Sequence, residues 1–163
     1  MMTSFGSPIS LERASIVSAS FNTFGEHRAG ERTFSLNLGR PDPRPLQVHD
    51  DLSNRTSLDY QLSVRYSLYA DGNQEDLSLD LTVVLLGAVS VADDDIIDIP
   101  EAQVLDWLEA NAVSLLYAKA RAYVEYISSM SPFGTCSLPT IDPYAFLETA
   151  ATEVGLSEAS DER

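Results

Sequence analysis

Residues Ser57–Tyr69 read SLDYQLSVRYSLY, and this stretch decides the fold class. Its apolar residues occupy every second position, and they are Leu58, Tyr60, Leu62, Val64, Tyr66 and Leu68. Polar residues fill the positions between them. A period of two with one apolar face is typical of a strand in an antiparallel sheet that is covered on one side. The stretch therefore predicts a strand whose apolar face requires a covering layer.

Three further segments alternate in the same way and predict three more strands. Their alternating apolar positions are Val17, Ala19 and Phe21, then Phe34, Leu36 and Leu38, and finally Leu77, Leu79, Leu81, Val83 and Leu85. The tetrapeptide ADGN at 70–73 favours a hairpin turn between the last two strands. Gly87 indicates either a bulge or a close approach of another backbone. The segment RPDPRPL at 40–46 contains three prolines, so it predicts a connector between strands.

The apolar period becomes helical between residues 101 and 130. Asp98 is a candidate N-cap before Pro100, and a break near Asn111 would divide this long segment into two helices. A loop follows at 131–143, and Asp142-Pro143 opens another helix that ends at Gly155. The predicted fold is α+β, a four-stranded antiparallel sheet followed by a long helix and a second C-terminal helix packed on one face. We expect one domain at 9–155, with tails at 1–8 and 156–163.

The balance of charge limits the classes of partner. The chain has 163 residues, with 25 acidic and 10 basic side chains, and its net charge is −15. Such a charge repels phosphate backbones and anionic membrane surfaces, and it keeps a protein soluble. No apolar run reaches the length of a membrane span, and the start shows no signal peptide. We therefore expect no nucleic-acid partner, no membrane insertion and a cytoplasmic location.

The residue types that usually perform catalysis are few and scattered. His27 and His49 lie in predicted turns or loops, where a histidine is usually solvated. Cys136 is the one cysteine, and no neighbouring basic residue activates its thiol. The run Asp93-Asp94-Asp95 lacks the spaced oxygen ligands of a calcium loop. We expect neither an enzyme nor a metal or other cofactor.

Aromatic residues cluster in the predicted helix–loop–helix region, at Tyr117, Tyr123, Tyr126, Phe133 and Tyr144. Such residues can form a core. They can equally hold unstructured apolar segments, because aromatic rings give a large contact area with loose specificity.

Two motifs in this region resemble those of the SecB family of molecular chaperones. The segment LYAKARAYV at 116–124 resembles the family signature L-[FY]-P-Y-x-R-E-x-[IV], although Ala118, Lys119 and Ala122 depart from it. The segment LPTIDPYAFL at 138–147 is similar to the family's L-x-x-P-x-x-F. Gly134-Thr135 stands where the family commonly has Gly-Thr, and Asn111-Ala112-Val113 resembles the family's P-N break. These matches are confined to residues 111–147.

The resemblance implies an ATP-independent holdase that binds non-native polypeptides in hydrophobic grooves, without nucleotide or metal. It implies a homotetramer, a dimer of dimers whose long helices pack at the dimer–dimer interface. The residues that we expect to line the groove are Phe21, Phe34, Trp107, Tyr117 and Phe133. Subunit packing or support of the helix is expected for Arg121, Tyr123 and Ile127.

The resemblance leaves the pathway open. In the export branch of the family the polar sheet face and the carboxyl tail bind the motor ATPase SecA, and protein export is the expected role here. The tail SEASDER is acidic, without the clustered basic and apolar residues expected for docking. Other members of the family protect antitoxins of toxin–antitoxin pairs. The alternatives are therefore a dedicated chaperone of one client, such as an antitoxin, or a structural or assembly protein on the same scaffold.

Overall fold

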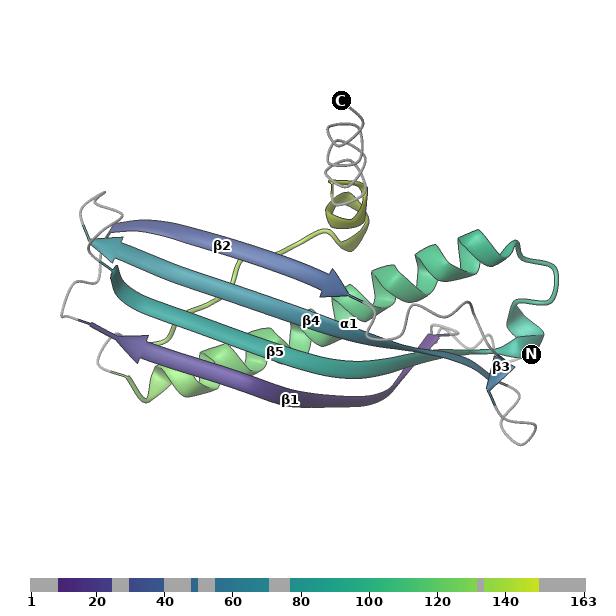
Figure 1. Cartoon of the computed structure of the whole chain (residues 1–163), viewed down its shortest axis with the longest axis horizontal. Helices are drawn as coiled ribbons and strands as arrows, with labels where there is room; N and C mark the ends of the chain where they lie inside the picture. The colour runs from purple at the N-terminus through teal and green to yellow at the C-terminus, as the bar shows by residue number, and fades with distance from the viewer. Residues whose placement is uncertain are drawn as a thin grey trace, which may run out of the picture.

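The computed structural model describes residues 9–24, 30–39, 48–49, 55–70, 77–131 and 134–149. The strands are β1 (Ile9–Thr23), β2 (Gly30–Gly39), β3 (Val48–His49), β4 (Arg55–Ala70) and β5 (Leu77–Ala92). A single 3₁₀ turn, η1 (Asp93–Asp95), precedes the long helix α1 (Glu101–Ser129). A further helix occupies 143–149. Figure 1 shows α1 behind one antiparallel sheet, and helix 143–149 projecting away from it.

The sheet has the strand order β1-β5-β4-β2, and the short β3 pairs with β4. Every pairing is antiparallel. The predicted hairpin, β4 and β5, forms the centre of the sheet, and β1 and β2 form its edges. The α+β prediction is confirmed, with four long strands followed by helices and α1 packed on one face. The second helix, predicted to pack on the same face, instead projects away from it (Figure 1). The sequence did not predict β3, and the connector 40–46 and the turn residues 71–73 lie outside the described residues.

The apolar face of β4 is covered by α1, as the alternation requires. Tyr60, Leu62 and Val64 have no exposed surface, and neither do Leu108 and Leu116 of α1. Burying each such side chain contributes about 2 kcal/mol before entropy is counted. The helix thus supplies the missing layer, and the core lies between it and the two central strands.

The long helix is continuous, so the predicted break near Asn111 is wrong. The Asn111 side-chain amide donates to the carbonyl of Trp107, one turn earlier, at 2.8 Å. This bond satisfies the polar side chain within the helix, and the neighbouring Ala112 and Val113 are fully buried. The predicted N-cap at Asp98 is also wrong. Pro100 is the N-cap residue, and its carbonyl accepts from Val104 at 3.1 Å.

Gly87 permits a close approach of α1 to the sheet, one of the two predicted interpretations. A Cβ at this position would overlap the Leu116 side chain and lie 3.1 Å from the Arg13 carbonyl oxygen. The bulges lie instead on the neighbouring strand β1, where the register shifts between Leu11 and Arg13 and again between Ile16 and Ser18.

The second shift on β1 corrects part of the predicted alternation. Ala19 and Phe21 pair with Val83 and Leu81, whose side chains face the helix. Val17 falls inside the bulge and is 52% exposed, so it does not continue the row that Ala19 and Phe21 share. An extra residue in one strand breaks the period of two locally.

Helix 143–149 begins where the sequence predicts. The Asp142 carboxylate accepts from the backbone N–H of Tyr144 at 3.0 Å and of Ala145 at 3.3 Å. This is the bonding of an N-cap residue. The predicted end of this helix at Gly155 lies outside the described residues. None of the described helices combines the length and apolarity that crossing a membrane would require.

Candidate functional site

The helix α1 does not cover the whole of the sheet face on which it packs. The helix packs mainly on β5 and makes smaller contacts with β4 and β1. Phe34, Leu36 and Leu38 of β2 are only half-buried on this side, packed against the edge of the core. The Phe34 ring meets the Tyr117 ring of α1 edge-on, with centroids 6.1 Å apart at 78°. We call Phe34, Leu36 and Leu38, together with Tyr117 and the loop 134–142, the β2 shelf.

The loop of the β2 shelf is tied to α1 along its length. The Tyr117 hydroxyl donates to the carbonyl of Pro139 at 2.6 Å. The backbone N–H of Cys136 donates to the buried Ser128 hydroxyl at 2.8 Å. Leu138 is 2% exposed and anchors the loop in the core. The shelf is therefore backed by a fixed layer.

The tyrosine and cysteine side chains of the β2 shelf stay uncharged at neutral pH. Burial raises the pKa of the Tyr117 phenol, and the nearby Arg121 charge only partly opposes this. Burial likewise raises the pKa of Tyr66 and of the Cys136 thiol. A thiol with a raised pKa is a poor nucleophile, so Cys136 contributes as a small apolar side chain.

The five predicted groove residues do not form one cluster. Phe34 and Tyr117 are in contact. Phe21 lies in the same cross-strand row, through Tyr66 and Leu81, but on the opposite edge strand. Three strand spacings, about 14 Å, separate it from Phe34.

The other two residues predicted to line the groove are Trp107 and Phe133. Trp107 is half-buried on α1, ten residues before Tyr117, which is about 15 Å along a helix. Phe133 lies outside the described residues. A role in binding for any of the five residues remains a prediction.

The residues predicted for subunit packing or helix support are partly buried on α1. Arg121 makes an ion pair with Glu125 at 3.3 Å, and its guanidinium lies 3.4 Å from the Ser137 hydroxyl. Ser137 in turn donates to Glu125 at 2.8 Å, and this bond is the main reason that the pKa of Glu125 is lowered. These contacts join the helix to the loop, and the role of the three residues remains a prediction. Tyr123 packs against the core, and Ile127 is half-buried.

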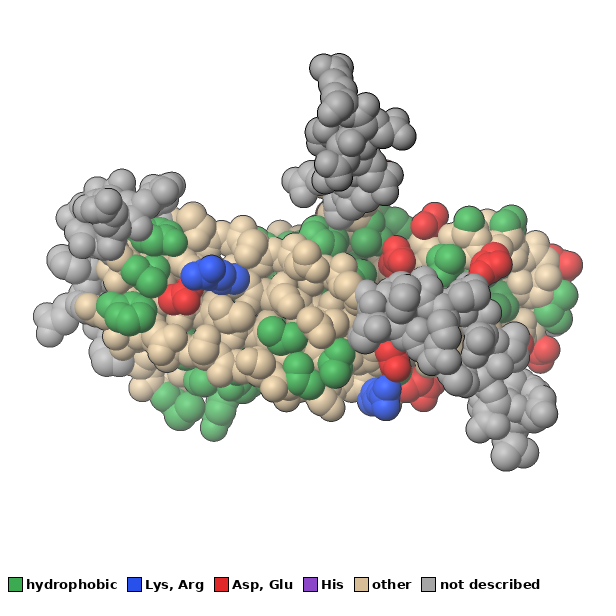
Figure 2. Space-filling view, viewed as in Figure 1, with side chains coloured by type: hydrophobic (Ala, Val, Ile, Leu, Met, Phe, Trp, Pro, Cys, Tyr) green, Lys and Arg blue, Asp and Glu red, His purple; other side chains and the backbone are tan. Residues whose placement is uncertain are grey.

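The sequence reasoning missed a second apolar surface along the other edge of the sheet. We call it the β1 edge patch. Its members are exposed by between 41% and 67%, and they are Ile16, Val17, Phe24, Tyr126 and Met130. The C-terminal half of α1 lies beside β1 in Figure 1, and apolar side chains project beyond that rim in Figure 2. The sequence contains one indication of this patch, because residues 14–24 include no charged residue.

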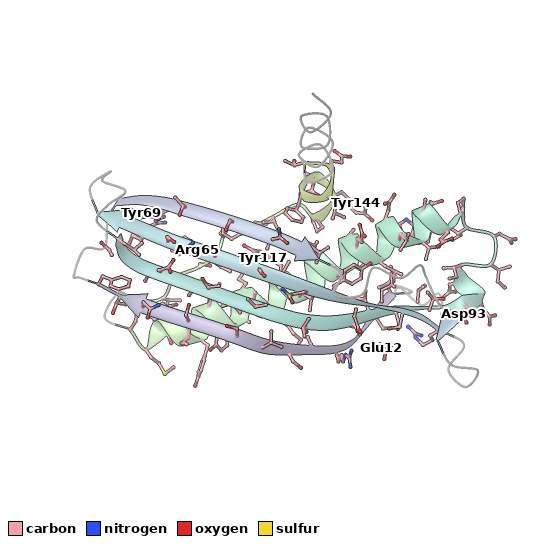
Figure 3. All side chains as sticks on the ribbon, in the orientation of Figure 1. Glu12, Arg65, Tyr69, Asp93, Tyr117 and Tyr144 are labelled. Carbon is pink, nitrogen blue, oxygen red and sulfur yellow. The ribbon has the colours of Figure 1, made fainter. Side chains whose placement is uncertain are left out.

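The face of the sheet away from α1 is mainly polar, with Leu86 as an exposed apolar residue, and its main charges are paired. Arg13 pairs with Asp59 at 2.8 Å, and Arg65 pairs with Asp80 at 3.1 Å. Ser67 also donates to Asp80 at 2.7 Å. Figure 3 labels Arg65 on this face, with Tyr117 on the helix behind the sheet. The Asp59 and Asp80 carboxylates of this face are thus each paired with an arginine.

The candidate catalytic and metal residues do not converge in the described part of the chain. The side chains of His27 and His49 lie outside the described residues. Asp93 accepts from the Thr56 hydroxyl at 2.8 Å, which supports the turn after β5. Across the described ranges, no group of three or more His, Cys, Asp or Glu side chains could hold a metal ion.

Among solved structures, a protein of unknown function from Streptococcus agalactiae is 9% identical, covers 81% of this chain and 97% of its own, and has a TM-score of 0.45. A SecB-like chaperone from Mycobacterium tuberculosis, in complex with a peptide from the HigA1 antitoxin, is 14% identical. It covers 82% of this chain and 90% of its own, also with a TM-score of 0.45. No protein-family model and no curated protein matches the chain.

Proposed function

We propose that this protein is an ATP-independent holdase chaperone that binds non-native polypeptides on the β2 shelf. One observation carries the proposal: the SecB-like motifs of the sequence build this shelf. Tyr117, from the first motif, contacts Phe34 and bonds to the carbonyl of Pro139 in the second motif. Half-buried aromatic and aliphatic side chains on a fixed layer suit apolar segments of varied sequence.

The surface chemistry agrees with such clients. The strand row of the shelf, Phe34, Leu36 and Leu38, is apolar, whereas the chain as a whole carries a net charge of −15. Folded acidic proteins are repelled by that charge, and exposed apolar segments of an unfolded chain still gain by burying surface on the shelf. Several weak contacts along one long client add up by avidity, without sequence specificity.

Assembly into a homotetramer, a dimer of dimers, is part of the proposal. The β1 edge patch supports it, because exposed apolar side chains gathered along one edge commonly mark a protein–protein contact. Each copy repels another through its net charge, and residues 14–24 form an uncharged stretch where this repulsion is weakest. Within a tetramer, several shelves would face one client.

We further propose that the clients are proteins destined for export from the cytoplasm. Export requires SecA to bind, and the paired charges of the open sheet face give SecA no single-sign patch to recognise. A calorimetric titration tests this step, and no heat of binding at micromolar concentrations would remove SecA from the proposal. Deleting 156–163 should leave client binding intact.

Aggregation of a chemically denatured, unrelated client, followed by light scattering without ATP, tests the holdase. The wild-type protein at stoichiometric tetramer should suppress scattering. Leu36→Asp, which places a charge on the shelf, should abolish suppression. Gln61→Asp, which adds the same charge on the exposed opposite face, should not.

Other outcomes separate the alternatives. Failure of the folded wild-type protein with every unrelated client, together with protection of one partner such as an antitoxin, would replace the general holdase by a dedicated chaperone. Failure with both kinds of client would leave a structural or assembly role.

A further inference from the structure

Strand β2 has a free edge in the described part of the structure. It is the last strand of the sheet, and its described pairing is with β4 alone. Every second residue of an edge strand directs its N–H and C=O away from the sheet, where they can pair with another strand. The end of the strand is open as well, since a Cβ at Gly39 would meet nothing within 4 Å.

From Thr33 onward, the edge at β2 lacks the devices that commonly protect an edge strand. Its ten residues pair with β4 without any shift of register. From Thr33 to Gly39 the strand contains no charged residue and no proline. Natural sheets discourage the addition of a further strand with bulges, charges or prolines. The seven residues from Thr33 to Gly39 therefore form a straight, uncharged edge that can serve as a template for strand addition.

The opposite edge is protected by these same devices. Two register shifts interrupt the pairing of β1 with β5. The first surrounds Glu12, which pairs with Arg55 at 3.3 Å and accepts a bond from Ser90. Bulges misalign the outward N–H and C=O groups, so an extended peptide has a regular ladder to join at β2 and an interrupted one at β1.

The side chains of β2 define what an added strand would carry. Phe34 and Leu36 lie on the helix side, in register with Tyr66 and Val64. Ser35 and Asn37 lie on the polar face between them. An added strand would place alternate side chains beside these two rows. Apolar residues fit on the shelf side, and small or polar residues fit on the other.

We propose that β2 binds an extended segment of a non-native polypeptide as an additional strand of the sheet, with the apolar side chains of that segment lying on the β2 shelf. The inference rests on the proposed holdase function and names its mode of recognition. Main-chain hydrogen bonds supply affinity that does not depend on sequence, and the shelf selects alternating apolar residues. The segment should span about ten residues and exclude proline from its centre.

Methylation of peptide nitrogens tests the main-chain bonds without altering any side chain. The probe is a fluorescein-labelled peptide of about ten residues, matched to the length of an average strand. It alternates valine with threonine and has a lysine at each end. A second version carries N-methyl groups along one edge only, and a third carries them along both edges.

Strand addition predicts a sharp difference between these peptides in a fluorescence anisotropy titration. The version methylated on one edge can still pair through its free edge, so it should bind within about threefold of the unmodified peptide. The version methylated on both edges should bind about tenfold more weakly or worse, since several hydrogen bonds are lost. Equal affinity of all three peptides would overturn the proposal.

Amide hydrogen exchange gives a second, independent readout on the protein itself. The unmodified peptide should slow exchange at alternate amides between residues 33 and 38 and leave the β1 amides unchanged. If the unmodified peptide binds without slowing amide exchange at β2, strand addition is contradicted, and the holdase function is not. If neither the unmodified peptide nor a denatured client binds, the holdase function fails, and strand addition fails with it.

Discussion

β1 and β2 flank the same central hairpin, and their sequences alternate in the same way, but they make different edges. On the β1 side the long helix lies close to the sheet, and Gly87 permits the approach. Two bulges interrupt the strand there, and exposed apolar side chains gather along its rim. On the β2 side the register is regular, and the apolar row is left half-buried beyond the helix.

The difference shows how one helix divides a sheet between two roles. Because α1 packs on β5, β4 and β1, its C-terminal half adds Tyr126 and Met130 to the β1 rim. That side presents side chains, which suit contact with another folded subunit. The β2 side presents backbone groups and a shelf, which suit an extended chain.

The largest expected effect comes from closing the space at Gly87. Gly87→Val would force the Leu116 side chain away from β5, and we expect a loss of about 3 kcal/mol in the free energy of unfolding. Gly39→Val on β2 is the matched control, since a Cβ there meets nothing within 4 Å. Urea unfolding measures both variants. Equal effects at the two glycines would contradict the close packing of α1 on the β1 side.

The next effect concerns the β1 edge patch. The double variant Tyr126→Glu and Met130→Glu places two charges in the apolar rim, and we expect self-association to weaken at least tenfold, about 1.4 kcal/mol. Light scattering coupled to size exclusion measures the mass of the assembly. Gln103→Glu, exposed near the start of α1, should leave the mass unchanged. An unchanged mass in the double variant would place the interface elsewhere.

A smaller effect should follow from the hydrogen bond that fixes the β2 shelf. Tyr117→Phe removes the bond to the Pro139 carbonyl, and we expect the free energy of unfolding to fall by about 1 kcal/mol at neutral pH. Tyr126→Phe, whose ring is 67% exposed, should have no such effect. Urea unfolding compares the two variants.

The pH dependence of Tyr117→Phe follows from the raised pKa of the phenol. In the wild-type protein the stability linked to the neutral phenol is complete below the ordinary pKa of 10.0. It is lost as the pH rises through the higher pKa of the folded state. Phenylalanine does not titrate, so the gap between wild type and variant should narrow above pH 10. A gap that stays constant or widens would contradict the burial of this hydroxyl.

The smallest effect concerns the exposed link between loop and helix. Ser137→Ala removes the main cause of the lowered pKa of Glu125, so that pKa should return toward its ordinary value of 4.5. A lowered pKa adds stability above the ordinary value, and this stability is lost as the pH falls through the lower folded value. Titration of the Glu125 carboxyl by NMR measures the change. Ser129→Ala, whose hydroxyl bonds to the Tyr126 carbonyl, should leave that pKa unchanged.

The sequence was informative where a single pattern decides the structure. Strict alternation around Tyr60 and Leu62 requires one covered face, and α1 covers it. Asp142 before a proline predicts the start of a helix, and its carboxylate caps that helix. These features depend on residues close together in the chain.

The rest depends on contacts that a local pattern does not encode. The break near Asn111 is absent because a side-chain bond within the helix satisfies the amide. Phe21 and Phe34 are aromatic residues of two predicted strands, but strand order places them on opposite edges of the sheet. The β1 edge patch joins a strand to the end of a helix about a hundred residues later in the chain, so only the fold brings its members to one side.

One comparison of two charge substitutions tests the central claim most directly. Leu36→Asp alters the β2 shelf, and Ile16→Asp alters the β1 edge patch. For each variant, fluorescence anisotropy with a labelled, denatured client measures binding, and light scattering measures the mass of the assembly. The account predicts that Leu36→Asp loses client binding and keeps its mass, whereas Ile16→Asp loses mass and each subunit still binds client. If both folded variants bind client as the wild type does, the β2 shelf is not the client site.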